Sequence, residues 1–84
     1  MIRKVYSVMD EKAKAYAQPF FLEHDGMALR AFNDVANDPQ SNICKHAADF
    51  TLWKLGEFDD VSGIFRSVKP EFLAKAVDFK VVSK

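Results

Sequence analysis

The 84-residue chain has few cysteines, glycines and prolines, and no net charge: it contains one Cys, three Gly and three Pro, and its formal charge at pH 7 is zero. A single cysteine, Cys44, excludes an intrachain disulfide and fits a reducing compartment. The three glycines are isolated from one another, so the sequence has no glycine-rich loop of the kind that cradles phosphates. Zero net charge argues against a strongly basic, histone-like DNA-binding protein.

Long apolar runs are also missing. No segment approaches the roughly 20 consecutive apolar residues that a membrane-spanning helix needs. The first twelve residues, "MIRKVYSVMDEK", contain no apolar stretch typical of a secretory signal. We therefore expect a soluble cytoplasmic protein that has no membrane partner.

Apolar residues are nevertheless abundant, since 49% of the chain is hydrophobic and eight residues are phenylalanine. The length predicts a single domain over residues 1–84, small enough that its own core is a limited source of stability. So much apolar material exceeds what a compact monomer of this size readily buries. We expect a partner surface, most simply a second copy of the chain in a homo-oligomer, with a dimer as the simplest case.

The first half of the sequence predicts two strands followed by a helix. Residues 2–9 are rich in β-forming side chains, and residues 19–24 form a short edge strand because Pro19 lacks the donor that an inner strand needs. Asp25 is a good N-cap for a helix over residues 26–37, whose apolar side chains recur at three- and four-residue spacing. This helix is the strongest local signal in the chain.

The second half predicts a hairpin and a last helix. Residues 45–50 are expected to form one helical turn. Residues 51–58 and 64–68 are strands, and the intervening "DDVSG" is their turn. Pro70 suits the first position of a short C-terminal helix over residues 70–77, and residues 78–84 are a final strand or a tail. The fold class is α+β: a small antiparallel β-sheet of about four strands, with one main helix packed on a face and a second short C-terminal helix.

No combination of residues forms a convincing metal or catalytic site. Asp59 and Asp60 lie in the predicted turn, where aspartate hydrogen-bonds the local backbone and needs no metal. Cys44, His46 and His24 supply at most three zinc ligands, and the fourth is missing. We expect no cofactor, no metal and no enzymatic activity.

Aromatic and basic residues alternate in several places, as in Trp53–Lys54 and Phe65–Arg66. Proteins that hold single-stranded nucleic acid combine aromatic rings that stack on bases with cations that contact phosphates. The alternative is that the rings are core, because strand alternation places Trp53 and Lys54 on opposite faces. The candidate nucleic-acid-binding residues are Arg3, Lys4, Tyr6, Lys12, Lys14, Tyr16, Trp53, Lys54, Phe65, Arg66 and Lys69.

Charge is unevenly distributed along the chain. Residues 1–18 carry four bases against two acids, a net of +2, and residues 61–84 carry five against two, a net of +3. Residues 19–60 carry three bases against eight acids, a net of −5. If the two ends lie together, they form a modest basic face opposite an acidic one; scattered, solvated charge is the alternative.

Several motifs in series resemble the small nonstructural protein of gokushoviruses, single-stranded DNA phages of the Microviridae. They are "PFF" at 19–21, "MALRAFND" at 27–34, "NDP" at 37–39, "KHAADFTLW" at 45–53 and "LGEFDDVSG" at 55–63. The resemblance extends to about residue 68, and departs from the family pattern at Ala47, where proline often follows the Lys-His pair. It implies a phage protein of the bacterial cytoplasm that binds DNA or serves single-stranded DNA synthesis and its coupling to packaging. It implies no catalytic residues.

Residues and resemblance together predict a non-enzymatic protein that binds single-stranded DNA during phage genome replication. The alternative is a protein–protein adaptor that docks on the phage replication initiator, the procapsid or a host replication factor without contacting DNA.

Overall fold

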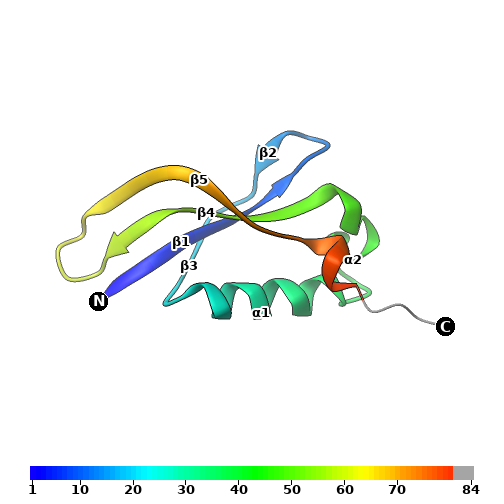
Figure 1. Cartoon of the computed structure of the whole chain (residues 1–84), viewed down its shortest axis with the longest axis horizontal. Coiled ribbons are helices and arrows are strands. Elements are labelled where there is room, and N and C mark those ends of the chain that lie inside the picture. The colour runs from blue at the N-terminus through cyan, green and yellow to red at the C-terminus, as the bar shows by residue number, and fades with distance from the viewer. Residues whose placement is uncertain (81–84) are drawn as a thin grey trace.

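A computed structural model describes residues 1–80 of the protein, which form one sheet with a helical layer on one side (Figure 1). The fold class expected from the sequence is confirmed. The elements in chain order are β1 (Ile2–Asp10), β2 (Ala15–Tyr16), β3 (Phe20–Leu22), α1 (Asp25–Ala36), α2 (Asn42–Lys45), the 3-10 helix η1 (Ala47–Asp49), β4 (Phe50–Asp59), β5 (Phe65–Lys75) and the 3-10 helix η2 (Ala76–Phe79).

The sheet is antiparallel, in the order β2-β1-β4-β5, and β3 pairs with the same edge of β1 as β2. The segment from β2 to β3 is thus one edge strand that is interrupted before Pro19. At the interruption the backbone N–H of Ala17 donates to the carbonyl of Val8 at 2.8 Å, and the Ser7 hydroxyl donates to the carbonyl of Ala17 at 2.6 Å. The Ser7 side chain therefore replaces a missing ladder bond, which suits an edge strand that contains proline.

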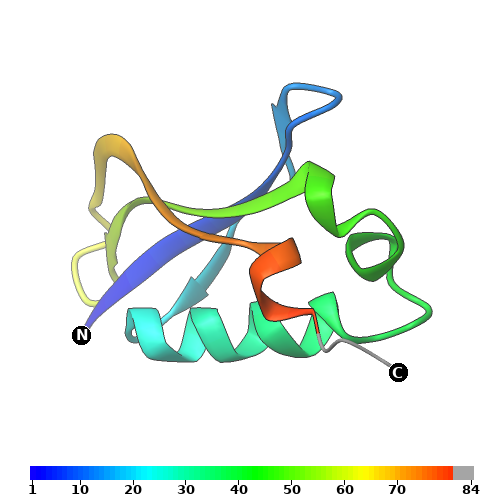
Figure 2. The ribbon, with the colours of Figure 1, turned by 45° about the vertical axis from the view of Figure 1, so that its right-hand side comes forward.

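Helix α1 covers one face of the sheet, and the core lies between them (Figure 2). Ala28, Phe32 and Ala36 recur at four-residue spacing and bury one stripe of α1 against Tyr6 and Leu52 of the sheet. Burying a side chain as large as Phe or Leu contributes about 1.5–3 kcal/mol. This interface between α1 and the sheet is the main source of stability in the fold.

The N-cap of α1 differs from the one predicted. His24 occupies the cap, and its Nδ1 accepts a hydrogen bond from the backbone N–H of Met27 at 3.3 Å. Asp25, the expected cap, is the first helical residue, and its carboxylate accepts hydrogen bonds from Tyr6 and Lys54 instead. A carboxylate in the first turn still complements the helix dipole.

The predicted helix over residues 70–77 is wrong in position. Strand β5 continues to Lys75, and the C-terminal helical element is the short η2. Pro70 is accommodated because Lys54 pairs with Glu71 while Gly56 pairs with Ser67, so that residues 68–70 bulge out of the ladder. The proposed final strand or tail falls partly on residues 81–84, which lie outside the described residues.

Two further observations concern membrane spans and metal-binding groups. No helix within residues 1–80 is long and apolar enough to cross a membrane. In the same part of the chain, no group of three or more His, Cys, Asp or Glu side chains is arranged to hold a metal ion.

Candidate nucleic-acid interface

The face of the sheet opposite α1 carries aromatic side chains, and no helix of residues 1–80 covers it (Figure 1). Register fixes which side chains share this face. Trp53 pairs with Ser7 and Phe58 pairs with Arg3, and Ser7 and Arg3 are four residues apart in β1, so both rings point to the same side. The opposite side of β1, with Tyr6, faces the helix.

Six aromatic rings of this face form two clusters. The Trp53 cluster consists of Trp53, Tyr16 and Phe72. The ring centroids of Trp53 lie 6.3 Å from Tyr16 and 5.5 Å from Phe72, both in edge-to-face geometry. The indole N–H of Trp53 donates to the hydroxyl of Thr51 at 2.8 Å, and that hydroxyl donates to the Glu11 carboxylate at 2.6 Å. The indole is therefore held in one orientation before any ligand arrives.

The Phe58 cluster consists of Phe58, Phe21 and Phe65. Each ring contacts the other two, with centroid separations of 4.6 Å for Phe58–Phe65, 5.6 Å for Phe21–Phe58 and 6.0 Å for Phe21–Phe65. Aromatic pairs at these separations contribute about 0.5–1.5 kcal/mol beyond their buried area. The cluster is thus a stable platform built from β3, β4 and β5.

Both clusters are open to solvent. Phe65 is 63% exposed and Phe72 is 47% exposed. Tyr16 and Phe21 are each about 40% exposed, whereas Trp53 and Phe58 are half-buried. Exposed aromatic rings that gather on one face of a small protein indicate an interaction surface. Of the four predicted stacking rings, Tyr16, Trp53 and Phe65 lie on this face.

The fourth predicted ring, Tyr6, has to be removed from the set. Its side chain is fully buried on the helix side of the sheet, and its hydroxyl donates to the Asp25 carboxylate at 2.6 Å. Burial first, and then this hydrogen bond, raise the pKa of the Tyr6 hydroxyl well above its usual value. Tyr6 is a core residue because alternation places it beside Lys4 and Val8, toward α1.

Three of the predicted cations are engaged in ion pairs. Lys54 points to the helix side, where its ammonium lies 3.0 Å from Asp25 and 3.6 Å from Glu71, and the hydrogen bond to Asp25 raises the pKa of Lys54. Lys4 lies 3.1 Å from Glu57. Arg3 lies 3.2 Å from Asp60, which also accepts a hydrogen bond from the N-terminal ammonium at 2.8 Å.

The other predicted cations are exposed. Lys12 and Lys14 lie in the β1–β2 turn, Arg66 follows Phe65, and Lys69 lies in the β5 bulge. None of these four makes an ion pair within residues 1–80. Lys12, Lys14 and Lys69 lie in a turn and a bulge of the strands that carry the aromatic rings, where they remain available to an anion. Arg66 does not point to the aromatic face, because it pairs with Glu57 and so lies on the opposite side of β5 from Phe65.

A family model, Phage ORF5 protein, matches residues 3–79, which is nearly the whole chain. The chain belongs to the Phage ORF5 protein family. It is therefore a phage protein. No curated protein and no solved structure matches the chain. Both aromatic clusters lie within the matched residues.

Four residues of the aromatic face were not predicted from the sequence: Phe21, Phe58, Phe72 and Lys75. Lys75 pairs with Thr51, which places it on the same face as Trp53. Phe72 was missed because residues 70–77 were assigned to a helix. Phe21 and Phe58 carried a signal, since both lie in predicted strands and aromatic side chains are typical of strands.

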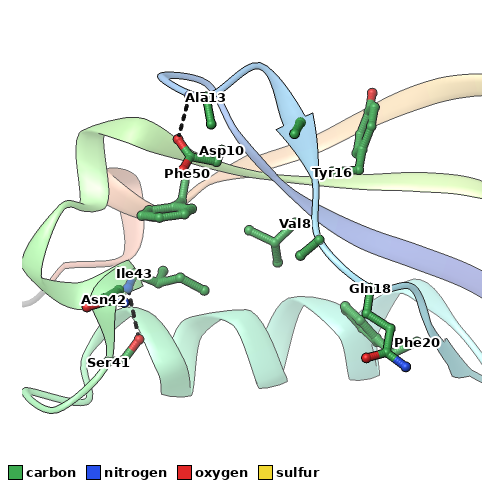
Figure 3. A pocket seen from close by; sticks show the side chains of 12 residues that line it. Val8, Asp10, Ala13, Tyr16, Gln18, Phe20, Ser41, Asn42, Ile43 and Phe50 are labelled. Atoms are coloured by element: carbon green, nitrogen blue, oxygen red, sulfur yellow. Dashed lines mark hydrogen bonds between the residues drawn. The ribbon is translucent and has the colours of Figure 1, made fainter.

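The protein has a second surface feature on the helix side, a groove of about 590 Å³ between the β1–β2 hairpin and α2 (Figure 3). Val8, Phe20, Ile43 and Phe50 supply most of its apolar lining. The backbone of Tyr16 borders the groove, but its ring points away from it, toward the aromatic face. The groove and the aromatic face are therefore separate surfaces.

Proposed function

We propose that this phage protein binds single-stranded DNA, without enzymatic activity, through the helix-free face of its sheet. The observation that carries the proposal is the pair of solvent-open aromatic clusters. Exposed lysines lie in the turn, the bulge and the strand beside them: Lys12, Lys14, Lys69 and Lys75. Rings that stack on bases and cations that follow the phosphates are the two parts of a single-strand binding surface.

A single strand fits this face better than a duplex. Its unstacked bases present their flat sides to aromatic rings, whereas the bases of a duplex are stacked on one another. The chain also has zero formal net charge, so its phosphate contacts are local and few. Binding should therefore depend on stacking as well as on charge, and should not resemble the charge-driven coating of duplex DNA by a basic protein.

A second copy of the chain fits the face less well. In a symmetric dimer the same patch meets itself across a twofold axis, so cations on one margin would approach the cations of the opposite margin. Like charges placed opposite one another across an interface are unfavourable. A polyanion with aromatic bases complements both the rings and the margin.

The resemblance of several sequence motifs supports a more specific role than that of a phage protein. The serial motifs "MALRAFND" and "KHAADFTLW" resemble the nonstructural protein of gokushoviruses, whose genomes are single-stranded DNA. We infer that the protein acts in the host cytoplasm during single-strand synthesis and its coupling to packaging, where such DNA is exposed.

Titration with a single-stranded oligonucleotide is expected to quench the fluorescence of Trp53, the sole tryptophan. Base stacking against the half-buried indole is the physical cause. A few phosphate contacts predict that the logarithm of the affinity falls with the logarithm of the salt concentration with a slope of about −2 to −3. Duplex DNA should give little change; quenching equal to that of the single strand, or no salt dependence, would contradict the proposal.

Lys75→Gln is expected to weaken binding by several-fold and to make the salt dependence shallower by about one phosphate contact, because Lys75 lies on the aromatic face. Lys45→Gln is the matched control, since Lys45 is also exposed but ends α2 in the helical layer. Anisotropy of a labelled oligonucleotide measures both. Equal effects of the two changes would show that only net charge matters.

The apolar groove favours a second candidate function, the protein–protein adaptor that docks on the phage replication initiator, the procapsid or a host replication factor. Co-purified nucleic acid, detected as a raised ratio of absorbance at 260 to 280 nm, supports DNA binding, whereas an adaptor would purify free of nucleic acid. Exposed apolar side chains away from the aromatic clusters, among them Met27 and Val61, support the expected homodimer. A strictly monomeric mass in light scattering at high concentration would contradict the dimer.

A further inference from the structure

The two aromatic clusters are separated by a stretch of β1, β4 and β5 that carries no aromatic ring on this face. Between Trp53 and Phe58 the paired positions are Val5 opposite Gly56, and Gly56 opposite Ser67. Val5 is buried beside its β3 partner Phe21, and a Cβ on Gly56 would meet the backbone of β5. No ring therefore projects on this face from β1, β4 or β5 between Trp53 and Phe58. The face is therefore two stacking platforms and not one continuous row of rings.

The separation of the platforms sets the length of chain that can reach both. At about 3.3 Å per residue, the five residues from Trp53 to Phe58 span about 16 Å, and the bulge at Leu55 shortens this slightly. Stacked bases are about 3.4 Å apart along one strand, so two adjacent stacked bases cannot occupy both platforms. A strand that reaches both must cross the gap with several intervening nucleotides.

Building on the proposed function, we propose that each protein chain holds single-stranded DNA at two base-stacking subsites, one on the Trp53 cluster and one on the Phe58 cluster. The nucleotides between them cross the Gly56 gap without stacking on a ring. The substrate class is thus an extended, unpaired DNA strand of at least about four nucleotides, the lower end of the range that small single-strand binding domains cover.

Two connected subsites make affinity depend on length in a characteristic way. Once one base is held, the second subsite encounters the same strand at high effective concentration, provided that the linker spans the gap. An oligonucleotide that is too short occupies one platform only. Rigid platforms strengthen this effect, and the hydrogen bond from Trp53 to Thr51 and the mutual contacts of the Phe58 cluster hold the rings in place.

The test is an anisotropy series with labelled oligothymidylates of about three, about six and about twelve nucleotides. We expect the affinity to rise at least about tenfold between the shortest and the middle length, and much less from the middle to the longest. Phe72→Ala and Phe65→Ala each remove an exposed ring from one platform. Each should weaken binding of the six-nucleotide strand about tenfold and flatten the rise with length, because one subsite is left.

Val77→Ala is the matched control, since Val77 is 46% exposed, almost the same as Phe72, but lies in η2 away from the face. Circular dichroism of all three variants serves to check that each one folds. A smooth length dependence, or a loss caused by only one of the two phenylalanine variants, overturns the two-subsite arrangement and leaves single-strand binding intact. No binding at any length overturns the proposed function itself.

Discussion

Replacing Gly56 with alanine is expected to lower the free energy of unfolding by more than about 3 kcal/mol, beyond the usual cost of an overpacked site. An ideal Cβ at Gly56 would lie 2.3 Å from the carbonyl oxygen of Arg66. That oxygen belongs to the backbone of β5, so it cannot rotate away as a flexible side chain would. Accommodating the methyl group requires β4 and β5 to separate at the centre of their pairing.

Urea denaturation followed by circular dichroism measures this effect as a shift of the midpoint. Gly26→Ala is the matched control, because its Cβ would meet nothing closer than the Nδ1 of His24 at 3.3 Å. Alanine in a helix gains up to about 1 kcal/mol over glycine, which offsets a small movement of the His24 ring. We expect Gly26→Ala to change stability by no more than about 1 kcal/mol. An unchanged midpoint for Gly56→Ala would show that β4 and β5 do not approach as closely as described.

Gly56 also links stability to the proposed site. The pair Trp53–Phe72 lies on one side of it and the pair Phe58–Phe65 on the other. Separating the strands at Gly56 would therefore change the relative positions of the two aromatic clusters. A folded remnant of Gly56→Ala should bind single-stranded DNA with a weakened dependence on length.

Helix α1 was predictable because its signals are local. Ala28, Phe32 and Ala36 recur at the helical period, and these residues form the buried stripe. Pro39 follows the helix and prevents its continuation. Only the N-cap was assigned to the wrong residue, because His24 and Asp25 both offer a hydrogen-bond acceptor at the start of the helix. His24 becomes the cap because the carboxylate of Asp25 accepts from Tyr6, which is distant in sequence.

The first part of β5 was predicted as a strand over residues 64–68, but its second part was not predictable because its stability is non-local. "PEFLAKAV" has good helix formers after a proline, which favours a helix on propensity alone. The hydrogen bonds to β4 outweigh that preference, with Leu52 opposite Ala74 and Trp53 opposite Phe72. Secondary-structure preferences of about 1 kcal/mol or less per residue are readily overridden by such tertiary contacts.

The aromatic face was only partly predictable because bulges change the phase of the strands. Trp53 and Phe58 are five residues apart, so strict alternation places them on opposite faces. Leu55 is an extra residue between the pairs Tyr6–Lys54 and Val5–Gly56, and it returns Phe58 to the same face as Trp53. The separation of Trp53 from Lys54 needed no bulge and was predicted correctly.

The final prediction concerns the charged cluster on the other side of the sheet, where Asp25→Ala is expected to lower the free energy of unfolding by about 2 kcal/mol at neutral pH. The change leaves the fully buried Tyr6 hydroxyl without its acceptor and leaves Lys54 with only Glu71, at 3.6 Å. The cost is moderate because the side chain of Asp25 is 39% exposed, so water screens the charge that is left. Asp34→Ala, at an exposed position of the same helix, should have almost no effect.

The dependence of stability on pH in acid tests the same cluster more sharply. Hydrogen bonds from Tyr6 and then from Lys54 lower the pKa of Asp25 below its usual value, so the folded state binds this proton less readily than the unfolded state. The stabilisation is complete above the unfolded pKa of about 3.9 and is lost as the pH falls through the lower folded value. Wild type should therefore lose more stability than Asp25→Ala between about pH 5 and about pH 2, whereas Asp34→Ala should follow wild type. The pKa values of Asp59 and Asp60 are lowered as well, by contacts at the β4–β5 turn and the N-terminus, but these contacts are common to all three proteins and cancel in the comparison. Parallel acid curves for wild type and Asp25→Ala would show that the Tyr6–Asp25–Lys54 cluster does not stabilise the fold through its charge.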